Sequence, residues 1–225
     1  GVPPGLRELV DENLALLRTG YPQGLPRRIS GERATAPALS DPGANFATMA
    51  NRSYLYSADS MPNESEIPRR IRCISEHNGD VPLAHKLMAG HGTTIVPSMI
   101  WNPPIGIAAD YAAGAALLLD LLRAVGEGLE DDAEFAACVA GTTAHLEKQR
   151  AKYFVLETGE IVSMTDDDPI AGVRHLATDD IPDAVTEAEA AIAGRNDTWL
   201  TSLRADWQKH FASFYGEALY FSFPG

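Results

Sequence analysis

Apolar positions recur at helical spacing over much of the chain. The longest such stretch, residues 106–125, is apolar nearly all round, which predicts a helix at the centre of the core. Residues 131–152 are predicted to form a second long helix. Shorter segments with the same spacing cover residues 170–177, 184–193 and 197–216.

The stretch from residue 66 to residue 90 also has helical spacing, with a break at Gly79 and Pro82. Two short helices are therefore predicted on either side of that break. The apolar positions that carry the pattern are Ile67, Ile71, Ile74, Leu83, Leu87 and Met88.

Signals for β-structure are few. Residues 93–100 are short and partly β-branched, so they could form a strand or a loop, and residues 153–164 are expected to form a hairpin that turns at Thr158 and Gly159. Pro and Gly break up residues 1–65, and residues 1–32 are expected to wrap around the core. The sequence predicts a mainly α fold with a minor β-hairpin, in a single domain over residues 1–225.

Size and charge narrow the classes of function. A chain of 225 residues with 45% hydrophobic residues can bury one core, and its formal charge of -13 disfavours nucleic acids and anionic membranes as partners. The apolar run 105–122 contains Asp110 and Asp120, so a buried helix is expected there and not a membrane span.

The location of the protein in the cell is less constrained. Cys73 and Cys138 fit either a reducing compartment or one disulfide in a secreted chain. Glycosylation sequons begin at Asn51, Asn63 and Asn196, and the chain opens without Met. These features together favour a glycosylated protein of the secretory pathway.

Two other motifs are interpreted as structural. Asp179, Asp180 and Asp183 match the spacing of a pyrophosphate-binding carboxylate motif, but Pro182 indicates the start of a helix. His77, His85 and His91 are spaced by eight and six residues, which does not place them on one helix face. They are expected to be surface or loop residues.

His210 and Glu217 are the candidate catalytic pair. They are seven residues apart, so on a continuous helix both side chains point the same way, about 10 Å apart along the axis. Phe214 shares that face, and aromatic surroundings raise the pKa of a Glu toward the range of a general acid or base. The alternative is an amphipathic helix end with a solvated His and Glu.

The segment 210–221 is similar to one in the haem-thiolate peroxidase family, which contains chloroperoxidase and the unspecific peroxygenases. In that family an Arg precedes the catalytic Glu by seven residues, and His210 stands in the position of the Arg. Residues 33–40 and 48–55 resemble the family's N-terminal signature, and residues 71–88 resemble its broken helix pair. The resemblance implies a helical fold of the chloroperoxidase type.

The resemblance also bears on cofactors. Ala36 occupies the position of the Cys whose thiolate binds haem iron in the family, which implies that thiolate-ligated haem is lost. Residues 130–134 resemble a segment whose Glu helps to hold Mg²⁺ beside a haem propionate. Glu130, Asp132 and Glu134 are therefore candidate metal ligands, although no cofactor is expected if haem is lost.

The resulting hypothesis is an enzyme that performs acid–base, non-oxidative cyclisation, isomerisation or elimination on a small apolar molecule of secondary metabolism. His210 and Glu217 would transfer protons, and four aromatic residues would bind the substrate. One alternative is a haem peroxidase or peroxygenase with another axial ligand, and with Mg²⁺ near the haem. The second is a non-catalytic carrier of a small molecule. The expected substrate-binding residues are Phe211, Phe214, Tyr215 and Tyr220.

Overall fold

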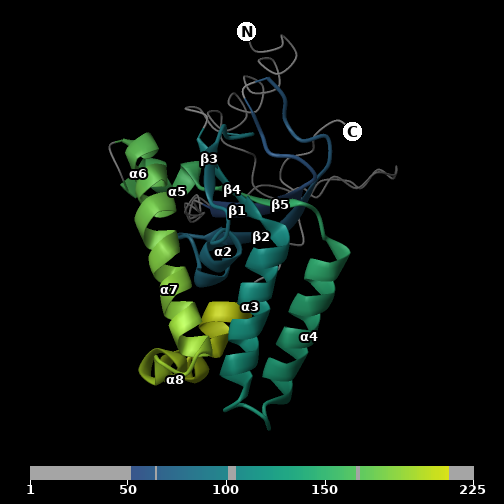
Figure 1. Cartoon of the computed structure of the whole chain (residues 1–225), viewed down its shortest axis with the longest axis vertical. Coiled ribbons are helices and arrows are strands. Elements are labelled where there is room, and N and C mark those ends of the chain that lie inside the picture. Colours follow the sequence, from purple (N-terminus) through teal and green to yellow (C-terminus); the bar gives the residue numbers. More distant parts are fainter. Residues whose placement is uncertain (1–51, 64, 101–104, 166–167, 213–225) are drawn as a thin grey trace, which may run out of the picture. The chain divides into compact units, whose positions relative to one another are not determined.

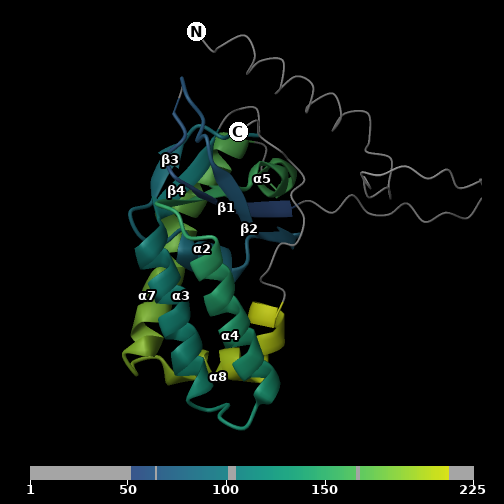
Figure 2. The ribbon, with the colours of Figure 1, turned by 90° about the vertical axis from the view of Figure 1, so that its right-hand side faces the viewer.

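A five-stranded antiparallel sheet lies at one end of a set of packed helices (Figures 1 and 2). The structure is a computed structural model that describes residues 52–63, 65–100, 105–165 and 168–212. All of these residues belong to one compact unit. The expectation of a single domain over the whole chain stays a prediction, and its segment 1–32 lies outside the described residues.

The strands run in the order β2-β1-β5-β4-β3. Strand β5 is central, and in the neighbouring strand β1 Tyr56 is paired with Cys73 of β2 on one side and with Val155 of β5 on the other. The strands are β1 (Arg52–Ala58), β2 (Ile71–Asn78), β3 (Thr94–Val96), β4 (Gly106–Asp110) and β5 (Tyr153–Glu157).

Both faces of the sheet are buried. Alternating residues such as Leu55 and Leu156 face the helices and join the main core, while Tyr56 and Val155 belong to a second cluster on the opposite face. Met99 and Ile100, from the loop after β3, pack into that second cluster. The strands therefore carry apolar residues at odd and even positions alike, as strands buried on both faces do.

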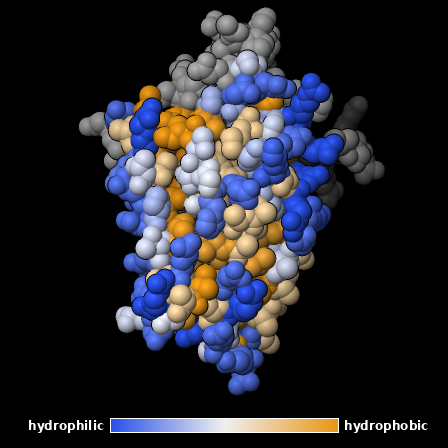
Figure 3. All heavy atoms as spheres, in the orientation of Figure 1, coloured by the Kyte–Doolittle hydropathy of each residue, from blue (hydrophilic) through white to orange (hydrophobic). Residues whose placement is uncertain are grey.

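Helices supply the rest of the main core. Helix α3 packs against α2, α4, α7 and α8, and helices α6, η1 and α7 follow one another as one continuous rod (Figure 1). Figure 3 shows apolar residues gathered along the line where α7 and α3 lie side by side. The helices are α2 (Leu83–Met88), α3 (Tyr111–Gly126), α4 (Ala133–Lys148), α5 (Gly159–Thr165), α6 (Pro169–His175), α7 (Ile181–Ile192) and α8 (Asp197–Ala205), with π-helical turns η1 (Leu176–Asp180) and η2 (Gln208–Ala212).

The contact between α2 and α3 depends on one glycine. A Cβ atom placed on Gly114 would lie 2.2 Å from the carbonyl oxygen of Met88, which is far inside van der Waals contact. Helix α3 begins one turn before Gly114, where the Asp110 side chain accepts a hydrogen bond from the amide of Ala113. Asp110 thus ends β4 and begins α3.

The prediction of a mainly α fold with only a minor hairpin is wrong, because the five-stranded sheet makes this an α/β architecture. The same finding overturns the all-α chloroperoxidase-type fold that the resemblance to haem-thiolate peroxidases implied. The first helix predicted in residues 66–90 is wrong, because residues 71–78 form strand β2, whereas α2 confirms the second helix of that pair.

Three other boundaries also need correction. Residues 153–164 form β5 followed by α5, so the predicted hairpin is wrong. The predicted helix over 106–125 begins only at Tyr111, after β4. The predicted helix over 197–216 ends at Ala205, and η2 is a separate π-helical turn. By contrast, α4 confirms the long helix predicted within residues 131–152. Residues 93–100, for which a strand and a loop were both open, contain the short strand β3.

Candidate functional site

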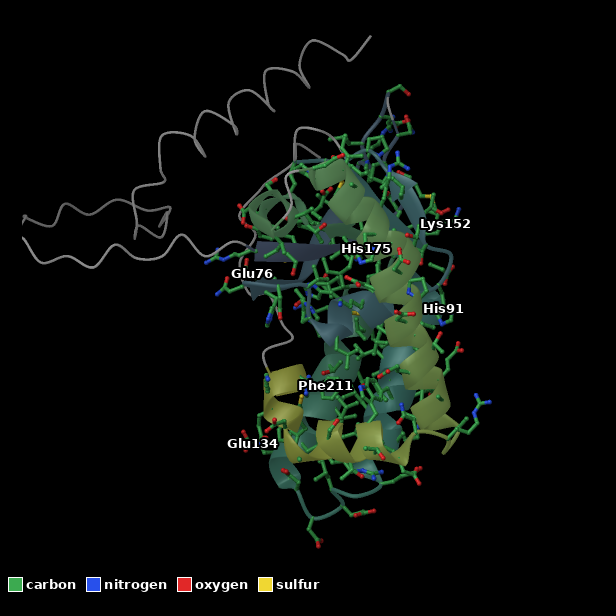
Figure 4. All side chains as sticks on the ribbon, turned by 90° about the vertical axis from the view of Figure 1, so that its left-hand side faces the viewer. Glu76, His91, Glu134, Lys152, His175 and Phe211 are labelled. Carbon is green, nitrogen blue, oxygen red and sulfur yellow. The ribbon has the colours of Figure 1, made fainter. Side chains whose placement is uncertain are left out.

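A groove of about 560 Å³ opens between the loop that joins β2 to α2 and the elements α7, α8 and η2. Figure 4 views the side of the molecule on which α7, α8 and the segment around Phe211 are seen. Basic, acidic and aromatic side chains line the groove together. Such a concave site with convergent polar groups is the usual form of a small-molecule site.

His210 enters the groove from η2. Its side chain is partly buried, and this burial lowers the pKa of the imidazole below its ordinary value. The positive charge of Lys209 lowers the pKa further, while the carboxylate of Asp206 acts in the opposite direction. At neutral pH the ring is therefore predominantly uncharged and can accept a proton.

His77 lines the same groove from the end of β2. Its Nε2 atom lies 2.9 Å from Oδ1 of Asp80, a residue of the loop that follows the strand. This contact orients the imidazole so that Nε2 faces the Asp80 carboxylate and Nδ1 is the nitrogen on the other side of the ring.

At the end next to η2 the groove shares His77, Lys209 and His210 with a recess of about 10 Å³. The recess is also lined by Ser75 and His85. Its volume is near the roughly 10–15 Å³ needed to hold one water molecule, and its lining is polar enough to bind one. The recess is too small for an organic group.

His85 is fully buried and forms a hydrogen-bonded chain with two serines. Ser53 Oγ donates its single proton to the Asp80 carbonyl at 2.9 Å, so His85 Nδ1–H must donate to Ser53 at 3.2 Å. Ser75 Oγ then donates to His85 Nε2 at 2.8 Å. Burial lowers the pKa of His85 to about 3, so the ring is neutral. Its hydrogen bond to Ser53, which bonds the Asp80 carbonyl, helps to hold the loop between β2 and α2 in place.

Carboxylates at the end of η1 and on α7 form the opposite wall of the groove. Asp183 and Glu187 are exposed and form no ion pair with any residue that the structure describes, whereas Asp180 lies 3.9 Å from the ammonium group of Lys86. Trp199 of α8 completes this side. The groove is therefore charged on two sides, acidic along α7 and basic along η2.

The predicted site residues are only partly described. Phe211 is 2% exposed and packs in the main core (labelled in Figure 4), so it is not among the residues that line the groove. Ala36, Glu217, Phe214, Tyr215 and Tyr220 lie outside the described residues. The prediction that Glu217 shares a face with His210 assumed a continuous α-helix with 3.6 residues per turn. His210 lies in the π-helical turn η2, where that spacing does not apply.

Among the three candidate metal ligands, Asp132 has structural partners. Its side chain accepts a hydrogen bond from the Phe135 amide at the start of α4 and another from Trp207 Nε1 at 3.0 Å. Glu130 and Glu134 are exposed. Within the part of the chain that the structure describes, no three His, Cys, Asp or Glu residues are grouped so that they could hold a metal ion.

Sequence reasoning missed the roles of two histidines. The expectation that His77, His85 and His91 are surface or loop residues is wrong for His85, which is buried, and His77 belongs to the groove. His91, labelled in Figure 4, is not among the groove residues. His77 ends β2, His85 lies in α2 and His210 lies in η2. Because the packing of η2 against α2 brings these elements together, spacing along the chain gave no signal.

A second unusual group is buried away from the groove. The carboxylate of Glu157 accepts hydrogen bonds from Ser98 Oγ at 2.6 Å and from the Met99 amide at 2.8 Å. Complete burial raises the pKa of Glu157 to about 7, although both hydrogen bonds act to lower it. This carboxyl group ties the loop after β3 to the sheet.

Both cysteines are free thiols, so the open question of a disulfide between Cys73 and Cys138 is answered in favour of no bond. Within the described residues, the helices are too short or too polar to span a membrane. Secretion and glycosylation stay predictions, and Asn51 lies outside the described residues.

Comparisons with known proteins place the chain in a family. Neither the curated proteins nor the solved structures contain a match to it. The family described as a domain of unknown function (DUF7822) matches residues 59–195. This range contains His77, His85 and α7 but ends before His210. Because the match covers more than half of the 225 residues, the chain belongs to this family.

Proposed function

We propose that the chain binds a small, charged organic molecule in the groove and acts on it by acid–base chemistry through His77 and His210. The observation that carries the proposal is that two imidazoles from distant parts of the chain line one groove. One is held by a carboxylate and the other is kept neutral by burial. Two histidines in different surroundings are suited to exchanging protons with one ligand.

The charged lining bears on the kind of ligand. Four basic and four acidic side chains line the groove, so a ligand with charged groups is favoured over the apolar molecule that the sequence suggested. The basic residues are His77, Lys86, Lys209 and His210, and the acidic residues are Asp80, Asp180, Asp183 and Glu187.

The reactions proposed are those that need only proton transfer, namely isomerisation, elimination or cyclisation. In such a step one imidazole takes a proton from a carbon or oxygen atom of the ligand, and the other donates a proton to a second atom. His77 replaces Glu217 as the partner of His210 in this proposal, because His77 lines the same groove.

The test uses the full-length protein and a mixture of small metabolites. Compounds retained by the protein after ultrafiltration are identified by mass spectrometry, and each is then incubated with wild type, His210→Gln, His77→Gln and the control His91→Gln. We expect products of unchanged mass or of mass lower by one water, with turnover reduced about 100-fold or more in His210→Gln.

Turnover at the wild-type rate in both groove variants would contradict the acid–base assignment. Retention of compounds without any conversion by wild type would instead support the carrier alternative. Retention that is equal in wild type and in a variant with Trp199→Ala and Lys86→Gln would contradict the location of the site.

A further inference from the structure

The basic groups of the groove differ in whether they are paired. His77 lies against Asp80, and Lys86 lies 3.9 Å from Asp180. Lys209 and His210, which are adjacent on η2, form no ion pair with any residue in the described ranges. Both residues line the groove, so they are placed to contact one ligand together.

The surroundings of His210 suit an anionic ligand. Burial and, after it, the charge of Lys209 lower the pKa of His210, while the carboxylate of Asp206 acts to raise it. His85, which lines the adjoining recess, is buried and neutral, so it does not add a charge there. An anion placed between Lys209 and His210 would relieve their repulsion and favour the imidazolium form.

We propose that Lys209 and His210 bind an oxyanion of the ligand, a carboxylate or a phosphate group, at the η2 end of the groove beside His77. The inference rests on the proposed function, because it names the ligand group that this same groove recognises. The recess is only about 10 Å³ in volume, so the oxyanion lies in the groove itself and one water can occupy the recess.

The acidic wall on α7 limits the size of the anion. Asp183 and Glu187 line the same groove without an ionic partner among the described residues, so a long polyanion such as a nucleic acid would be repelled. A small ligand with one oxyanion can place that group at η2 and direct a neutral or cationic group toward α7. The fitting class is therefore a small amphoteric or singly anionic metabolite.

Proton uptake should accompany oxyanion binding. Because His210 is mainly neutral before binding and charged beside the anion, affinity should fall as pH rises. For a carboxylate ligand, an increase of one unit in the pKa of His210 on binding would weaken the affinity by at most about tenfold as pH rises.

The experiment is a titration of the full-length protein with sodium phosphate and, separately, sodium acetate, with sodium chloride at matched ionic strength as the reference. Binding is followed by the imidazole NMR signals of His210 and His77. The variants are Lys209→Gln and the matched control Lys148→Gln, an exposed residue at the end of α4. The two titrations distinguish a phosphate site from a carboxylate site.

We expect saturable binding of at least one oxyanion, about tenfold weaker in Lys209→Gln than in wild type and unchanged in Lys148→Gln. Equal affinity in the two lysine variants, or no saturation beyond the effect of chloride, would overturn the inference. If neither oxyanion binds but metabolites still shift His77 and His210, this inference fails and the proposed function stands. If metabolites shift neither histidine, both fail.

Discussion

The substitution Glu157→Gln should make the protein more stable at alkaline pH. Glu157 is fully buried, and its pKa is raised from 4.5 to about 7, chiefly by burial. Between these two values the folded state holds a proton that the unfolded state has lost, so stability falls as pH rises. The difference between the two pKa values corresponds to about 3 kcal/mol of unfolding free energy. This stability is present at acidic pH and is fully lost above about pH 8.

Glutamine has the same shape and carries no charge. Its amide oxygen can accept the hydrogen bond from the Met99 amide. Its NH₂ group can donate to Ser98 Oγ once that hydroxyl, which donates to the carboxylate in wild type, turns its proton away. Glu157→Gln should therefore match wild type near pH 4.5 and exceed it by up to about 3 kcal/mol at pH 8.

The assay is urea unfolding followed by tryptophan fluorescence at pH 5 and pH 8, with Glu189→Gln on the exposed side of α7 as the control. The control should change stability by less than about 0.5 kcal/mol at both pH values. The reasoning would be refuted if wild type and Glu157→Gln were equally stable at pH 8. It would also be refuted if the difference in their unfolding free energies were the same at both pH values.

Three further substitutions test the packing around the site. Gly114→Ala should lower the free energy of unfolding by about 1 to 3 kcal/mol, despite the higher helix propensity of alanine, because the new methyl group meets the backbone of α2. Thermal unfolding measures this change, and a variant more stable than wild type would contradict it. Trp207→Phe should lower the free energy of unfolding by about 1 to 3 kcal/mol, because the hydrogen bond to Asp132 is lost. An unchanged midpoint of urea unfolding would show that this bond is not stabilising. Ser75→Ala should lower the free energy of unfolding by about 1 to 3 kcal/mol, because Nε2 of buried His85 loses its hydrogen-bond donor. NMR should show a change at that nitrogen, and an identical spectrum would contradict the direction assigned to the hydrogen bonds of His85.

Local signals predicted the long helices well. Asp132 caps α4 through its side chain, so a polar residue at that position does mark a helix start. Pro182 does not mark a free helix start, because it lies in the first turn of α7 within the continuous rod of α6, η1 and α7, and Asp180 forms no capping hydrogen bond there. The helix over residues 106–125 was placed too early because Gly106–Asp110 continues the apolar run without a change of pattern. Only Asp110, as the capping residue, distinguishes the two elements.

The sheet could not be predicted from periodicity. In β2, Ile74 faces the helices while Cys73 packs on the opposite face, so alternation is lost and the isoleucines imitate helical spacing. The same holds for β1, where Leu55 and Tyr56 are both buried. Strands buried on both faces lack the period of two that identifies half-exposed strands.

The catalytic role of His210 stays a prediction. His210 was singled out by its position seven residues before Glu217 and by the resemblance to haem-thiolate peroxidases, and it lines the groove. His77 was set aside because its spacing from other histidines fits no single helix, and its place beside His210 depends on tertiary packing alone. A signal for His85 was also absent, since a buried histidine with two serine partners cannot be distinguished by sequence from an exposed one.

The most direct test of the account is an NMR screen of small charged molecules against full-length protein with isotope-labelled histidines. The chain has six histidines, so each imidazole can be followed separately. The account predicts that bound molecules shift His77 and His210 together and leave His91 and His175 unchanged. Binding that shifts His91 or His175 while His77 and His210 stay fixed would contradict it.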